Sequence, residues 1–171
     1  MPSSLRYDLA QFDGKDATVL QDIFRANHPP SDEVLDLLVD VVGDEDVNMQ
    51  TGASWLLRYY ARDGFALAAD QVGRLAAHLG AMHDGFGRLH LCQAIGELTI
   101  PTEHAEAFAE FFRESAESRN TFLRAWAPHG LFHLALQHDR YMDEARTMVE
   151  AALADPAASV RARARKTLAG E

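Results

Sequence analysis

The sequence predicts an all-α protein, and three observations support this fold class. Apolar residues recur at the i, i+3, i+4, i+7 spacing that buries one stripe of a helix, for example over residues 34–42. No stretch shows the alternation of apolar and polar residues that is typical of strands. Proline and Asp-Gly breaks separate the helical stretches and leave no long linker. We therefore expect about nine helices, arranged mostly in consecutive pairs, in a single domain over residues 1–171.

The last helix is the most regular stretch of the chain. Asp155 and Pro156 open it, because Asp caps free N–H groups and proline suits the first helical turn. Val160, Ala164 and Leu168 then recur every four residues and form a narrow apolar stripe. The small side chain at Ala164 lets a neighbouring helix approach closely. This pattern indicates a helix that packs against others in a stack.

The Ala-to-Leu spacing of this helix recurs upstream, starting at Ala53, Ala94 and Ala127. Successive alanines, including Ala164, lie 41, 33 and 37 residues apart, close to the period of two-helix repeats. Over about residues 31–170 the chain resembles the HEAT family of helical repeats, most clearly in its final Asp-Pro…Val-Arg…Ala…Leu pattern. The resemblance implies a short right-handed α-α superhelix of the armadillo-like kind. The second helix of each pair would line its concave surface, the usual binding surface in this family.

Local signals place the individual elements. Residues 1–12 are expected to be irregular, with apolar side chains that shield the first helices. A leading helix over 13–28 ends at His28-Pro29-Pro30, since a residue before proline avoids the helical region. Four helix pairs follow, over about 31–62, 66–98, 101–137 and 139–169.

Further expectations concern single positions within these pairs. Pro128 falls inside an expected helix over 119–137, where it removes a hydrogen bond and clashes with the carbonyl of Arg124. We expect a kink or break at this point. The inward-facing stripes are expected to include Val47, Phe86 and Leu168.

Composition limits the class of protein. The only cysteine, Cys92, rules out an internal disulfide framework. No apolar run approaches the length of a membrane span, and residues 1–6 show no signal-peptide core, so a cytoplasmic location and no membrane partner are expected. The net charge of −10 argues against general nucleic-acid binding, which needs a basic face.

The charge is unevenly distributed along the chain. Residues 1–50 carry 11 acidic and 3 basic side chains, whereas residues 156–171 carry 4 basic and 1 acidic. One end of the stack is therefore acidic and the other basic. This arrangement is compatible with self-association through oppositely charged ends or with a charged partner. The alternative is two solvated faces.

Candidate binding residues follow from the repeat register. Arg124 lies three residues before Ala127, and Arg161 lies three residues before Ala164. Arg165 directly follows Ala164. On a concave surface these arginines would hold a carboxylate-rich peptide, a phosphate or a nucleic-acid backbone. Outward-facing Trp55, Arg58 and Tyr59 would supply a peptide anchor at the other end of the groove. Alternatively, the arginines are solvated and the aromatic rings belong partly to the core.

Catalytic or metal-binding residues are sparse. His129 and His133 are four apart and share a helix face, and His138 follows them, so the three form a candidate metal site. The sequence has neither the glutamate of a His-Glu-x-x-His pattern nor any His-Glu pair like those of the HEAT-type di-iron hydroxylases. Ordinary groove histidines are the alternative. We expect Cys92 to be a buried structural cysteine and expect no cofactor.

The sequence favours a non-catalytic binding module over an enzyme. Such a module would hold a protein or peptide on its concave surface, as adaptors, assembly factors and toxin-neutralising proteins do. The alternative is a HEAT-like enzyme, either a histidine-metal protein or a relative of the HEAT-like DNA glycosylases that remove alkylated bases. In the latter, Asp44, Asp46 or Asp63 would supply the acid. The acidic net charge opposes a nucleic-acid substrate.

Overall fold

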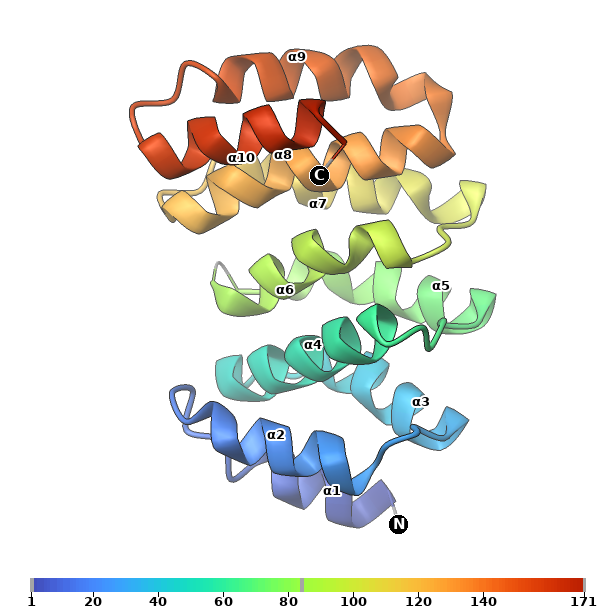
Figure 1. Ribbon diagram of the computed structural model, residues 1–171. Helices are drawn as coiled ribbons and strands as arrows, with labels where there is room; N and C mark the ends of the chain where they lie inside the picture. Colours follow the sequence, from blue (N-terminus) through green and yellow to red (C-terminus); the bar gives the residue numbers. More distant parts are fainter. Residues whose placement is uncertain (1, 84, 171) are drawn as a thin grey trace.

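The computed structural model describes residues 2–83 and 85–170, which form ten α-helices joined by short turns (Figure 1). The helices are α1 (Pro2–Leu9), α2 (Ala17–Ala26), α3 (Asp32–Val41), α4 (Val47–Arg62), α5 (Ala69–His78), α6 (Phe86–Ala94), α7 (Ala105–Ala116), α8 (Thr121–Gln137), α9 (Met142–Ala152) and α10 (Ala158–Leu168). Four 3₁₀ turns extend or precede them: η1 (Leu79–Ala81), η2 (Ile95–Glu97), η3 (Thr102–His104) and η4 (Asp139–Tyr141). The described residues contain no strand, so the predicted all-α class is confirmed.

The helices form five consecutive pairs that stack in two layers (Figure 1). The first layer contains α1, α3, α5, α7 and α9, and the second contains α2, α4, α6, α8 and α10. Helices of the second layer run in the same direction, so their N-termini line one edge of the stack, on the left in Figure 1. None of the described helices is long and apolar enough to cross a membrane. The right-handed curvature stays a prediction.

The expectation that residues 1–12 are irregular is wrong. Pro2–Leu9 form α1, which packs on α2 and α3 and completes the first helix pair. Leu5 and Leu9 lie four apart and are buried together with Phe12, so one stripe of this short helix faces the core. The expected leading helix is shorter than 13–28. Asp13 accepts hydrogen bonds from the N–H groups of Lys15 and Asp16, which holds these residues in a turn before α2 begins.

One polar position repeats in four second-layer helices and fixes the register of the stack. Its side chain donates a hydrogen bond to the carbonyl oxygen six residues earlier, in the turn that precedes the helix. The four donor–acceptor pairs are Gln50–Asp44 (2.8 Å), Arg88–Met82 (3.1 Å), Arg124–Ser118 (3.3 Å) and Arg161–Asp155 (2.7 Å). The donors lie 38, 36 and 37 residues apart, by subtraction of their numbers. The repeat that contains α6 is therefore centred on Leu91, and the predicted alignment at Ala94 is wrong by three residues.

Helix α8 continues through Pro128, which excludes a break, whereas a kink at this point stays a prediction. Two residues later, Gly130 lets α8 approach α7 closely. A Cβ atom at Gly130 would lie 2.4 Å from Cε1 of the fully buried Phe112. The glycine is therefore required by the packing of the two helices.

Three apolar residues that we expected to face inward are exposed: Val47 at 46%, Phe86 at 52% and Leu168 at 49%. Val47 and Phe86 are the first residues of α4 and α6 and lie at the N-terminal edge of the second layer, where few neighbouring helices cover them. Leu168 is the last residue of α10. The remaining apolar stripes form one core from α1 to η4, with a smaller cluster between α8, α9 and α10.

Substitution Gly130→Ala is expected to lower the free energy of unfolding by about 1–3 kcal/mol, because the new methyl group overpacks the contact with Phe112. Gly80→Ala is the matched control, since nothing lies within 4 Å of a Cβ at that position. Urea unfolding of the two variants checks the prediction. Equal stability of both variants would contradict the close approach of α7 and α8.

Candidate functional site

The exposed side of the second layer carries an unusual share of aromatic residues, and we call it the second-layer face. The positions two residues before the repeated donor are Asn48, Phe86, Phe122 and Ser159, on α4, α6, α8 and α10. Phe86 and Phe122 are 52% and 55% exposed. Core packing does not require these two rings, because they lie in solvent at matching positions on neighbouring helices. Both tryptophans of the chain, Trp55 and Trp126, contribute to the same face.

At the first end of this face, α2 and α4 form an aromatic cluster. Trp55 and Tyr59 stack with ring centroids 3.9 Å apart, and the Arg58 guanidinium lies 5.4 Å from the Tyr59 centroid. Phe24 of α2 meets Tyr59 edge-on at 6.2 Å. These rings, with Gln21 and Arg25, line a hollow of about 300 Å³. The sequence-predicted residues Trp55, Arg58 and Tyr59 are thus brought together, and all three are half-buried.

At the other end, Trp126 of α8 lies under the guanidinium of Arg163 from α10, 4.0 Å from the ring centroid. His129 stands 5.0 Å from Trp126 and 4.3 Å from His133, measured between ring centroids. His129 Nδ1 shares a hydrogen bond of 3.1 Å with the Thr167 hydroxyl, which ties α8 to α10. The face therefore ends in a second aromatic cluster with a cation above it.

The three histidines of the candidate metal site are not brought together. His129 and His133 are adjacent, but His138 Nε2 lies 2.8 Å from the carbonyl oxygen of Ile100 and faces the turn before α7. Within the described chain, no group of three His, Cys, Asp or Glu side chains is placed to hold a metal ion. The arrangement fits the alternative of ordinary groove histidines.

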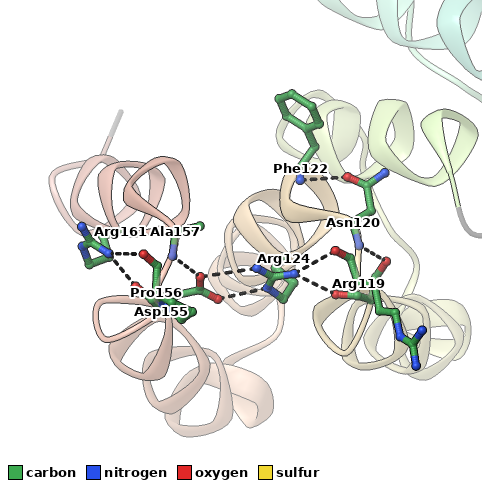
Figure 2. Close-up of polar contacts among 9 residues, drawn as sticks. Arg119, Asn120, Phe122, Arg124, Asp155, Pro156, Ala157 and Arg161 are labelled. Carbon is green, nitrogen blue, oxygen red and sulfur yellow. Dashed lines mark hydrogen bonds and ion pairs between the residues drawn. The ribbon is translucent and has the colours of Figure 1, made fainter.

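Two arginines of the predicted binding cluster, Arg124 and Arg161, make structural contacts. Arg124 and Arg161 meet at the turn between α9 and α10, as Figure 2 shows. Arg124 donates to the Asp155 carboxylate (Nε–Oδ2 3.0 Å) and to the carbonyls of Ser118 and Arg119, while Arg161 donates to the carbonyls of Asp155 and Pro156. These two side chains satisfy the turn, and their role in binding stays a prediction.

Arg165 is exposed on α10, away from Arg124, and Arg163 is the arginine of that helix that reaches the second-layer face. The sequence reasoning missed Phe86, Phe122, Trp126 and Arg163. The repeat register contained the signal for the two phenylalanines. When the repeats are aligned on the shared donor, Phe86 and Phe122 occupy the same position. The predicted alignment of α6 at Ala94 was three residues off and therefore did not show this match.

The candidate acids of the base-processing alternative have structural roles. Asp46 caps α4 by accepting from the N–H groups of Asn48 and Met49. Asp44 pairs with Arg6, and Asp63 lies 3.5 Å from His28 Nε2. Cys92 is fully buried, and desolvation raises the pKa of its thiol to about 12, which keeps it protonated and unreactive. The expected structural role of Cys92 is confirmed.

The charged residues behind the predicted end-to-end contact lie at opposite ends of the stack. Asp8 and Asp22 line a hollow of about 330 Å³ between α1 and α2, at the first end. Arg161, Arg165 and Lys166 lie on α10, at the last end (Figure 1). Self-association through these ends stays a prediction.

Two buried histidines make the second layer sensitive to acid. Burial and the nearby positive charge of Arg58 together lower the pKa of His90 to about 4. Burial, with His133 and Arg163 nearby, lowers the pKa of His129 to about 3. Both side chains are therefore neutral in the folded chain at neutral pH.

The free energy of unfolding is expected to fall as the pH drops from 7.5 to 5. Below the ordinary histidine pKa of 6.5 the unfolded chain takes up protons that the folded chain excludes, and each buried histidine costs about 1–2 kcal/mol at pH 5. The double variant His90→Gln/His129→Gln should lose most of this slope in urea unfolding. The exposed His83→Gln is the control. An unchanged slope in the double variant would disprove the assignment.

Removal of the Arg124 side chain tests its structural role. Arg124→Met breaks the bonds to Asp155 and to two turn carbonyls, so a loss of about 1–3 kcal/mol in unfolding free energy is expected. Arg165→Met, an exposed arginine, should change stability by less than about 0.5 kcal/mol. Thermal and urea unfolding compare the two variants, and equal losses would show that the turn does not depend on Arg124.

The geometry of the site is the only guide to function. Comparison with protein-family models, with curated proteins and with solved structures gives no match for this chain.

Proposed function

We propose that the chain is a non-catalytic binding module of the HEAT-like kind that holds a segment of a partner protein on its second-layer face. The observation that carries the proposal is a row of aromatic side chains on consecutive second-layer helices: the stacked, half-buried Trp55 and Tyr59 on α4, then the exposed Phe86 and Phe122 on α6 and α8. Aromatic side chains of this kind dominate the energetics of protein interfaces. The row spans several helix pairs, which suits an extended or helical segment of a partner.

The hollow beside Trp55 and Tyr59 gives this face an anchoring point. Its volume of about 300 Å³ accommodates one large apolar side chain, held between α2 and α4. Arg25 of α2 lines the hollow, and the Arg58 guanidinium lies 5.4 Å from the ring centroid of Tyr59. A partner segment with an apolar residue followed by carboxylates fits this combination.

The same geometry gives little support to an enzyme. The buried polar side chains serve structural contacts: Ser54 Oγ lies 3.2 Å from His90 Nδ1, and Arg88 bonds to Ser115 and Glu114. Among the residues that the structure describes, no buried side-chain nitrogen or oxygen lacks a hydrogen-bond partner. A binding surface explains the exposed rings, whereas the enzyme alternatives do not.

The test is a peptide-library selection against the full chain, followed by affinity measurement of the selected peptides. Trp55→Ser and Phe122→Ser are each expected to weaken binding at least about tenfold, because they remove the half-buried and the exposed anchor ring of the row. The intrinsic fluorescence of the two tryptophans, both on this face, provides an independent readout.

Tyr7→Ser is the matched control, since Tyr7 is an aromatic residue 68% exposed on α1 in the first layer. It should leave affinity unchanged within about twofold. Selected peptides that bind Trp55→Ser and Phe122→Ser as tightly as the wild type would refute the proposed surface.

A further inference from the structure

A groove runs along α9 on the side that faces α7 and α8, away from the aromatic row. Six α9 residues line it, at two adjacent positions in each of three successive turns: Asp143, Glu144, Thr147, Met148, Ala151 and Ala152. The opposite wall comes from the end of α7 and from α8, and Val160 of α10 closes the floor. The hollow has a volume of about 580 Å³, within the range of ligand-binding cavities.

Small side chains, and an ion pair between α7 and α9, keep this groove open. Ala116, Ala151 and Ala152 stand where larger residues would fill the space between α7 and α9. Arg113 of α7 spans the gap and binds the Glu144 carboxylate of α9 with two bonds, Nε–Oε1 at 2.6 Å and Nη2–Oε2 at 2.9 Å. This bidentate pair holds the two helices at a fixed separation.

The groove combines an apolar floor with an acidic rim. Pro128, Ala152 and Val160 are buried beneath it, and Met148 is half-buried along its wall. Four carboxylates and the Arg124 guanidinium line it, and Arg113 pairs with one of these carboxylates, which leaves a net charge of −2 by subtraction. Glu144 and Asp155 are paired with Arg113 and Arg124, whereas the exposed Glu117 and Asp143 have no ion-pair partner within residues 2–83 and 85–170.

We infer that this groove is a second binding site, for a basic amphipathic segment of a partner protein. Its apolar side chains would cover Met148 and Val160, and its lysine or arginine side chains would meet Glu117 and Asp143. Residues 143–152 of α9 extend about 14 Å, so a segment of about ten helical residues matches the groove. The charge of this site is opposite to that of Arg25 and Arg58 at the hollow on the second-layer face, so the two sites select different segments.

The probe is an amidated twelve-residue helical peptide with leucines at i, i+3, i+4 and i+7 and lysines between them, labelled for fluorescence anisotropy. It is expected to bind the full chain with a Kd in the micromolar range at about 0.15 M salt. The methyl signals of the five methionines serve as a second readout, in which Met148, assigned through Met148→Leu, shifts and the others do not. A peptide with glutamates in place of the lysines should not bind.

Two variants test the rim and the floor. Glu117→Gln/Asp143→Asn should weaken binding by about tenfold or more, and Ala151→Trp should block it by filling the groove. The matched controls are Asp139→Asn/Glu150→Gln, two exposed acids outside the groove, and Ala77→Trp, an exposed alanine on α5. Both controls should keep the Kd within about twofold.

The proposal is overturned if the control pair weakens binding as much as the rim pair, since the peptide would then sense only net charge. It is also overturned if Ala151→Trp binds normally, or if the Met148 signal shifts with protein concentration alone, which would make a second copy the occupant. Trp55→Ser should leave binding of this peptide unchanged, so failure here is distinguishable from failure of the second-layer face.

Discussion

The stack depends on one repeated contact, a long polar side chain near the start of a second-layer helix that bonds back to the preceding turn. At Gln50 and Arg124 the side chain also reaches the next turn along the stack, through His83 in one case and Asp155 in the other. Turn carbonyls and N–H groups need partners when they are partly covered by neighbouring turns. The repeated side chain supplies these hydrogen-bond partners, and it recurs at nearly constant intervals along the chain.

This constraint determines what remains for binding. Because Arg124 and Arg161 are committed to turns, the cations of the second-layer face are others, such as Arg58 beside Tyr59 and Arg163 over Trp126. The register also repeats a position two residues before the donor, at the N-terminal edge of each helix, where Phe86 and Phe122 are exposed. A structural repeat thus creates equivalent surface positions on neighbouring helices, and the choice of side chains at those positions distinguishes one such stack from another.

The sequence predicted the helical class and the later helix pairs, because apolar periodicity reports which stripe of a helix is buried. It failed for α1, whose eight residues offer only Leu5 and Leu9 as a periodic signal. It also failed for the arginines. Spacing showed that Arg124 and Arg161 are equivalent, but only coordinates show that a turn carbonyl lies within reach of each. The groove along α9 has no sequence signature, since it arises from alanines and an ion pair that join separate helices.

The net charge of −10 conceals a division that bears on both proposed sites. Carboxylates gather along α9 and the turns, where Glu117 and Asp143 flank an apolar floor, while Arg58, Arg62 and Arg163 lie on the second layer. Exposed charges more than about 10 Å apart are largely screened at physiological salt, so each face acts on its own surroundings rather than through the total charge. A segment that matches one face carries the wrong charge for the other. Two partners, or two segments of one partner, therefore have no reason to compete for the same surface.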